Sequence, residues 1–232
     1  MSEQVKNQAV SFDVWKTLIR SNPEHKPARN QLVADRFGID PEIMQVALRQ
    51  TDVLCDRLTD STGTQFGPVE RLEKIADLLK TPLGVKAIQA LAIEVQEQFL
   101  LYPVVLYEPY LLSTLDAIQE DNPIALTSNT GFFDGVYMRE ALDQAGILQR
   151  TDHHIFSNEV AAAKPSAKIF AQTATLLGLA PEHITHVGDN HTADYKGATA
   201  AGMKAVHLAD KPVDNTTITA TTIKDAREKG LI

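Results

Sequence analysis

The apolar residues of this 232-residue chain fall mainly in short runs, and several runs are followed directly by polar side chains. Runs at 9–12, 124–126 and 184–187 have the length of strands and are bounded by turn residues, which predicts buried strands. The polar positions that follow them include Asp13, Ser128 and Asp189, and an apolar run at 161–163 leads into Lys164. The carboxyl ends of parallel strands meet at one edge of a sheet. We therefore expect these side chains to converge.

Between residues 20 and 102 the pattern is helical and contains no convincing strand. Helices are predicted over 27–37, 41–58, 69–79 and 85–101, with a loop over 59–67 that includes Gly63 and Gly67. The second of these helices has two stripes. Its apolar stripe, which we expect to be buried, consists of Ile43, Ala47, Leu54 and Leu58, and its polar stripe of Gln45, Arg49, Asp52 and Asp56.

From residue 109 onward helices and strands alternate along the chain. Helices are predicted over 109–119, 133–145 and 167–177 and from Asp194 to Ala201, with strands ending at 128, 157, 189 and 208. This alternation is typical of βαβ units and a parallel sheet. The predicted fold class is α/β: a Rossmann-like three-layer core (residues 1–19 and 106–232), interrupted after its first strand by a helical cap domain (residues 20–105). Its position makes the insert a lid over the carboxyl edge of the sheet.

Composition limits the classes of partner that the protein is expected to bind. The formal net charge of −8 and the isoelectric point near 5.3 argue against a nucleic-acid or anionic-membrane surface. A single cysteine, Cys55, excludes an intramolecular disulfide. The first residues lack an apolar signal core, and no apolar run reaches the ~18 residues of a spanning helix. We predict a soluble, cytoplasmic protein that acts on a small molecule, and the sequence gives no prediction of oligomeric state.

The acidic residues predict a metal site. Asp189 and Asp194 lie five residues apart on a strand end and the following turn, where both can face Asp13. Three carboxylates in one place repel one another unless a cation lies among them. Oxygen ligands of this kind suit Mg²⁺. Taken singly, Asp13 and Asp194 could be no more than capping residues of a turn and a helix.

Asp13, Ser128, Lys164 and the Asp189–Asp194 pair occur in the order found in the haloacid dehalogenase superfamily, which the chain resembles over nearly its whole length, including a helical cap after the first strand. The resemblance implies that Asp13 is the nucleophile, which forms an acyl intermediate that water opens. It implies that Lys164 neutralises and orients the site, and that the Trp15 backbone carbonyl is a further Mg²⁺ ligand. Ser128, with Thr127 as the alternative, would bind a phosphate oxygen, helped by the backbone amides of Asn129 and Thr130. Thr17 would bond near the nucleophile.

Trp15 departs from the pattern of the superfamily's phosphatases. Those enzymes carry a second Asp two residues after the nucleophile, as proton donor and base, whereas an indole N–H cannot exchange a proton near neutral pH. Dehalogenases of the superfamily have an aromatic residue there, but lack the paired acids and need no metal. Three hypotheses remain: a Mg²⁺-dependent phosphohydrolase acting on a small phosphorylated metabolite, a 2-haloacid dehalogenase, and a catalytically weakened metal-binding relative with a binding or regulatory role.

A few other residues are candidates for subsidiary roles. His191 could replace the missing proton carrier, although an exposed loop histidine is the commoner interpretation. Arg49 or Arg57 could reach a substrate carboxylate or phosphate, unless they simply face solvent. The loop over 63–67, with Gln65 and Phe66, could select the substrate. The adjacent His153 and His154 have no partner at the spacing of zinc ligands.

Overall fold

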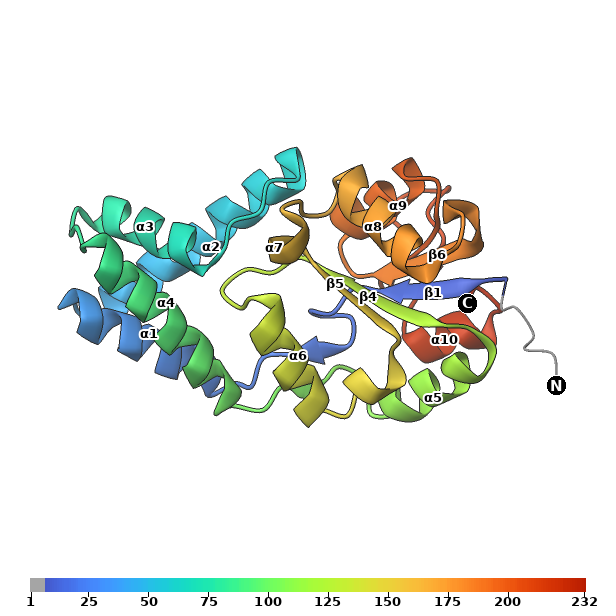
Figure 1. The fold of residues 1–232 in the computed structure, drawn as a ribbon, viewed down its shortest axis with the longest axis horizontal. Helices are drawn as coiled ribbons and strands as arrows, with labels where there is room; N and C mark the ends of the chain where they lie inside the picture. Colours follow the sequence, from blue (N-terminus) through green and yellow to red (C-terminus); the bar gives the residue numbers. More distant parts are fainter. Residues whose placement is uncertain (1–6) are drawn as a thin grey trace.

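The computed structural model describes residues 7–232. Within them, six strands form one sheet in the order β5-β4-β1-β6-β7-β8, and every pairing in it is parallel (Figure 1). The strands are β1 (Ala9–Phe12), β4 (Ile124–Ser128), β5 (His153–Phe156), β6 (Ile184–Gly188), β7 (Lys204–Leu208) and β8 (Thr219–Ala220). The predicted α/β class with a parallel sheet is confirmed. Because β1 lies between β4 and β6, the ends of these three strands are neighbours.

Helices cover both faces of the sheet and make the three layers. Side chains of β1 alternate between the faces: Val10 and Phe12 belong to the core under α5 (Leu111–Asp121) and α10 (Ile223–Glu228), and Ala9 to the core under α8 (Ala167–Leu177). The remaining helical segments of this part are α6 (Gly135–Gln144), α7 (Ser157–Val160), α9 (Gly197–Ala200), a π-helix at His191–Lys196 and 3₁₀ turns at Leu148–Arg150 and Pro181–His183.

Four further helices form a bundle to one side of the sheet (Figure 1). They are α1 (His25–Phe37), α2 (Pro41–Thr62), α3 (Pro68–Leu79) and α4 (Val85–Leu100), hereafter the cap helices. Asp40 caps α2 with its side chain, and Gly38 and Gly63 end α1 and α2 in the left-handed conformation. Two short strands, β2 (Ile19–Arg20) and β3 (Val105–Leu106), pair antiparallel where the chain enters and leaves the bundle. The division into core and cap domains stays a prediction.

The predicted buried stripe of α2 is wrong at two of its four positions. Ile43 is 55% exposed and Leu54 is 49% exposed, and Leu58 is only half-buried, whereas Ala47 is buried as predicted. The face that packs inward is shifted by one residue, because this helix carries apolar side chains on two faces. Its buried residues are Met44, Ala47, Leu48, Thr51, Cys55 and Thr59.

Several boundaries also differ from the predicted ones. The loop predicted over 59–67 begins only at Gly63, because α2 continues to Thr62. The apolar run at 161–163 is not a strand, since Ala161 adopts a left-handed conformation after α7. The π-helix replaces the first turns of the helix predicted from Asp194. Neither β8 nor α10 was expected from the sequence pattern.

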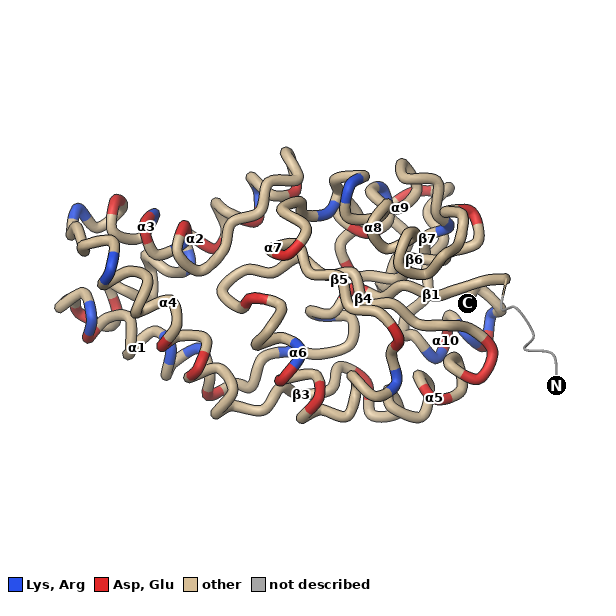
Figure 2. The backbone as a smooth tube through the Cα atoms, in the orientation of Figure 1, with Lys and Arg blue, Asp and Glu red and all other residues tan. Residues whose placement is uncertain are grey.

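Charges are spread over the whole molecule. Lys, Arg, Asp and Glu alternate on both the cap helices and the part that carries the sheet (Figure 2). Among residues 7–232, no helix is long and apolar enough to cross a membrane.

Candidate active site

Asp13 follows β1 directly and occupies the edge where the strands end. Its backbone N–H donates to the Val187 carbonyl of β6 (2.9 Å), so the neighbouring strand fixes its position. The chain then turns sharply: the N–H groups of Leu18 and Ile19 both donate to the Val14 carbonyl, at 2.9 and 3.1 Å. Asp13 is 7% exposed, which leaves its carboxylate accessible only from the cavity described below.

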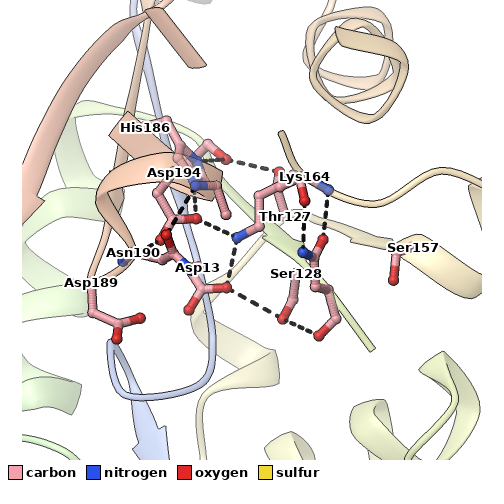
Figure 3. Close-up of polar contacts among 12 residues, drawn as sticks. Asp13, Thr127, Ser128, Ser157, Lys164, His186, Asp189, Asn190 and Asp194 are labelled. Carbon is pink, nitrogen blue, oxygen red and sulfur yellow. Dashed lines mark hydrogen bonds and ion pairs between the residues drawn. The ribbon is translucent and has the colours of Figure 1, made fainter. Parts of the chain in front are cut away.

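Lys164 bridges two carboxylates beneath the cavity. Its Nζ lies 2.6 Å from Asp13 Oδ1 and 2.7 Å from Asp194 Oδ1, and the side chain is 1% exposed (Figure 3). Asn129 clamps the lysine backbone, accepting from the Lys164 N–H (2.7 Å) and donating to its carbonyl (3.0 Å). Ser128 Oγ approaches Asp13 Oδ1 at 3.5 Å. The ends of β1 and β4 and the segment before α8 thus meet at one carboxylate.

The three predicted acids lie together. Asp13, Asp189 and Asp194 each offer an oxygen within 4.8 Å of the others. Asn190 holds the turn between the last two: its N–H donates to Asp194 Oδ2 (2.9 Å), and its side chain accepts from Thr192 and Ala193. With all three carboxylates ionised and Lys164 protonated, the cluster carries two net negative charges. An all-oxygen donor set with this charge fits a divalent cation such as Mg²⁺.

Burial and the close spacing of charges shift the pKa values of these residues. Burial and the charges of Asp13 and Asp194 raise the pKa of Asp189 to about 7. Burial likewise raises the pKa of Asp13, although Lys164 opposes it. For Asp194, burial would raise the pKa, but the Lys164 ammonium and His186 outweigh it and hold the pKa below its usual range. Burial lowers the pKa of Lys164, but Asp13 and Asp194 outweigh it and raise that pKa, so the lysine stays charged.

A buried polar network lies under the acids, and its key member, His186, was missed by the sequence analysis. His186 is fully buried on β6; its Nε2 lies 3.2 Å from Asp194 Oδ1 and its Nδ1 lies 2.9 Å from Ser11 Oγ. Burial lowers the pKa of His186, so the imidazole is neutral and donates to the carboxylate from Nε2. Thr127 belongs to this network, 2.8 Å from Ser11, and not to the cavity.

The cavity above the acids has a volume of about 300 Å³ and extends to the cap helices. The acids Asp13, Asp189 and Asp194 line it together with Lys164 and residues 129–131. The cap helices contribute His25, Lys26, Arg29, Asp52, Asp56 and Arg71. Arg71 donates to Asp52 and to Asp56, at 2.9 Å each. No spacing pattern had singled out the cap residues of this list as a group.

Some predicted residues lie further from the cavity. Thr17 is fully buried and does not line it, and within residues 7–232 its hydroxyl has no hydrogen-bond partner. The Thr130 N–H donates to Ser157 Oγ (2.7 Å), so this amide is already bonded, contrary to the expectation that it binds phosphate. Trp15 does line the cavity, with its ring 6.0 Å from those of Phe99 and Phe133. A role for its carbonyl stays a prediction.

The subsidiary candidates lie away from the acids. His191 contacts Thr217 at 3.2 Å, stacks on Tyr195 and does not line the cavity. Arg49 and Arg57 are exposed on the outer face of α2, beside a separate surface hollow.

The loop that starts at Gly63 connects the cap helices to the sheet-bearing part. Gln65 Nε2 donates to the Thr130 carbonyl (2.6 Å), and the same side chain accepts from Ser157. Phe66 lies under the Lys74 ammonium, 5.2 Å from it. Neither Gln65 nor Phe66 lines the cavity, so this loop holds the two parts together rather than facing a ligand.

Comparison with known proteins agrees with this geometry. A glyceraldehyde 3-phosphate phosphatase from Methanopyrus kandleri is 41% identical over 69 residues, 30% of this chain and 30% of that protein. The first curated relatives are matched over less than a third of their own length. Two solved structures share the fold over almost the whole chain. One, a putative haloacid dehalogenase-type hydrolase from Bacillus subtilis bound to magnesium, has a TM-score of 0.74 at 14% identity, covering 98% of this chain and 100% of that one.

The other is a 2-haloacid dehalogenase from Pseudomonas syringae pv. Tomato DC3000, with a TM-score of 0.69 at 16% identity, covering 97% of each chain. Residues 8–202 match the family described as haloacid dehalogenase-like hydrolase, which is most of the chain. The resemblance stated from the strand-end residues is thus confirmed: the chain belongs to the haloacid dehalogenase-like hydrolases.

Proposed function

We propose that the protein is a Mg²⁺-dependent phosphohydrolase that uses Asp13 as nucleophile on a small phosphorylated metabolite. The observation that supports this best is the cluster of three carboxylates at the floor of a cavity, two of which, Asp13 and Asp194, contact one buried ammonium. With all three carboxylates ionised, the cluster carries two net negative charges. A haloacid dehalogenase would have to bring an anionic substrate to this cluster without a cation, against the repulsion of three carboxylates. The likeness to a phosphatase from Methanopyrus kandleri supports the same choice.

In the proposed reaction, one oxygen of Asp13 attacks phosphorus, the bond to the substrate alcohol breaks, and an aspartyl phosphate forms. Both recorded side-chain contacts of the Asp13 carboxylate fall on Oδ1, from Lys164 and Ser128. Neither side chain contacts Oδ2, so we take Oδ2 as the attacking oxygen. Water then attacks the phosphorus, which releases phosphate and restores the carboxylate.

The other residues of the site would neutralise charge and position the reacting groups. Lys164 would neutralise charge on the transferring phosphoryl oxygens while keeping Asp13 aligned. Asp13, Asp189 and Asp194, with the Trp15 carbonyl, would hold Mg²⁺, which when bound screens the repulsion between the carboxylates and the phosphate. Ser128 and the Asn129 amide would contact the phosphate. Since Trp15 cannot move a proton, we expect slow turnover that depends on the acidity of the leaving alcohol.

The test is phosphate release from a panel of small phosphomonoesters, measured with Mg²⁺ and with a chelator. We expect release that requires the metal and that is abolished in Asp13→Asn. Asp77→Asn, an exposed position on α3 outside the cavity, is the matched control and should behave as the parent. Halide release from 2-haloacids without metal, and no phosphate release, would reject the proposal in favour of dehalogenation.

A further inference from the structure

Two polar side chains of α1 are buried and line the cavity on the side of the cap helices. His25 is 1% exposed, and within residues 7–232 neither of its ring nitrogens has a hydrogen-bond partner. Arg29 is 7% exposed. They are four residues apart, so they share one face of the helix, and both line the cavity. Buried polar groups without partners are rare in native structures and call for a ligand or another explanation.

Arg29 carries a charge that its protein partners only partly satisfy. Asp52 makes its short contact with Arg71 (2.9 Å), and its distance to Arg29 is 3.7 Å. The guanidinium of Arg29 also contacts the neutral Asn30 oxygen, at 3.2 and 3.3 Å, and the Phe132 ring. Arg71, by contrast, has two carboxylate partners. A buried guanidinium that shares its one counter-ion, Asp52, with a second arginine is a binding position for a further anion.

The segment that follows β4 links His25 and Arg29 to the acid cluster. The guanidinium of Arg29 lies over the Phe132 ring, 4.8 Å from its centre, and the His25 and Phe133 ring centres are 5.4 Å apart. Phe132 and Phe133 follow Ser128, which contacts Asp13, by only a few residues. The cavity of about 300 Å³ is at the small end of the range for ligand pockets, which suits a small molecule.

We infer that His25 and Arg29 form a second subsite, which binds a carboxylate of the substrate while the acid cluster takes its phosphate. This inference rests on the proposed function and adds the substrate class: short phosphate monoesters that carry a carboxylate a few bonds from the ester oxygen. The planar fork of Arg29 matches the two oxygens of a carboxylate.

The charge of the subsite favours a carboxylate over a second phosphate. Lys26, Arg29 and Arg71 line this part of the cavity together with Asp52 and Asp56, which leaves one net positive charge to balance one negative charge. Burial and the neighbouring Arg29 lower the pKa of His25 to about 4, so at neutral pH its imidazole is uncharged and contributes one N–H donor rather than a second positive charge.

The test compares 2-phosphoglycolate, which carries a carboxylate, with ethyl phosphate, which does not. The readout is the ratio of KM for ethyl phosphate to KM for 2-phosphoglycolate, determined for the parent, Arg29→Met and His25→Phe. Arg36→Met is the matched control, because Arg36 lies on the same helix but pairs with Glu94 at the surface. We expect the ratio to fall about 10- to 100-fold in Arg29→Met, as a charged hydrogen bond is lost, and severalfold in His25→Phe. It should stay within about twofold in Arg36→Met.

Equal KM values for the two esters in the parent, or an unchanged ratio in Arg29→Met, would overturn the inference. A loss of kcat for both esters in His25→Phe, with no change in the ratio, would also overturn it, since His25 would then transfer a proton. Calorimetric binding of the same two esters separates this inference from the proposed function. Tighter binding of 2-phosphoglycolate that is lost in Arg29→Met, without hydrolysis of either ester, would uphold the subsite and reject the phosphohydrolase.

Discussion

Gly188, the last residue of β6, is the position where one methyl group should do most damage to the site. A Cβ built there would lie 2.3 Å from both Cγ and Oδ2 of Asp194. To reach even 3.0 Å the carboxylate must retreat by at least about 0.7 Å. It is held by Lys164 at 2.7 Å, His186 at 3.2 Å and the Asn190 N–H at 2.9 Å. It therefore cannot move without lengthening charged hydrogen bonds.

We expect Gly188→Ala to destabilise the protein by about 2–4 kcal/mol, from overpacking and weakened charged hydrogen bonds together. Urea denaturation measures this loss. Gly84→Ala is the matched control, because a Cβ at Gly84 meets nothing within 4 Å. Melting curves with Mg²⁺ at about 100 times its Kd should show the ~2.7 kcal/mol of metal stabilisation in the parent and in Gly84→Ala, but not in Gly188→Ala. A Gly188→Ala protein as stable and as responsive to Mg²⁺ as the parent would refute this reasoning.

Three further predictions concern the same site. Replacing His186 by Leu should cost about 1–3 kcal/mol in urea denaturation, because Asp194 loses a buried donor; an unchanged midpoint would contradict this. In chelator, stability should fall as pH rises from about 4 to 7, because folded Asp189 keeps its proton to about 7 whereas the unfolded carboxyl loses it near 3.8. Asp189→Asn should remove the part of the pH dependence that Asp189 causes. A pH profile of stability equal to that of the parent would contradict this attribution. Trp15→Asp should speed Mg²⁺-dependent phosphate release by about 10²–10⁴-fold, because it restores a proton carrier. Equal or slower release at the same folded fraction would show that another group transfers the proton.

The strand ends could be predicted because their pattern is local. A buried strand followed by a polar residue is visible in the sequence, and the parallel pairing of β4, β1 and β6 then brings Asp13, Ser128 and Asp189 to one edge. Asp194 joins Asp13 and Asp189 from the π-helix that follows β6. The same reasoning fails for β2, β3 and β8, since strands of two residues are too short to show a period.

The cap end of the cavity could not be predicted because it depends on packing between distant segments. The α2 helix has apolar residues on two faces, and which of them is buried is decided by how α1 and α3 pack against it. His25 and Arg29 show only a four-residue spacing in the sequence, which many solvent-exposed helices share. Their burial arises where α1 meets Phe132 and Phe133, about a hundred residues later. Arg49 and Arg57, which the sequence offers as candidate substrate contacts, lie on the exposed face of α2.

The most direct measurement is the identity of the group that becomes attached to Asp13 during turnover. The protein is mixed with a phosphomonoester and Mg²⁺, quenched in acid within the first turnover and digested, and the peptide containing Asp13 is analysed by mass spectrometry. We predict a single phosphoryl group on Asp13, absent when Mg²⁺ is omitted and absent in Asp13→Asn. A carbon-linked ester on Asp13 after mixing with a 2-haloacid, with no phosphorylated peptide from any phosphomonoester, would contradict the assignment of a phosphohydrolase.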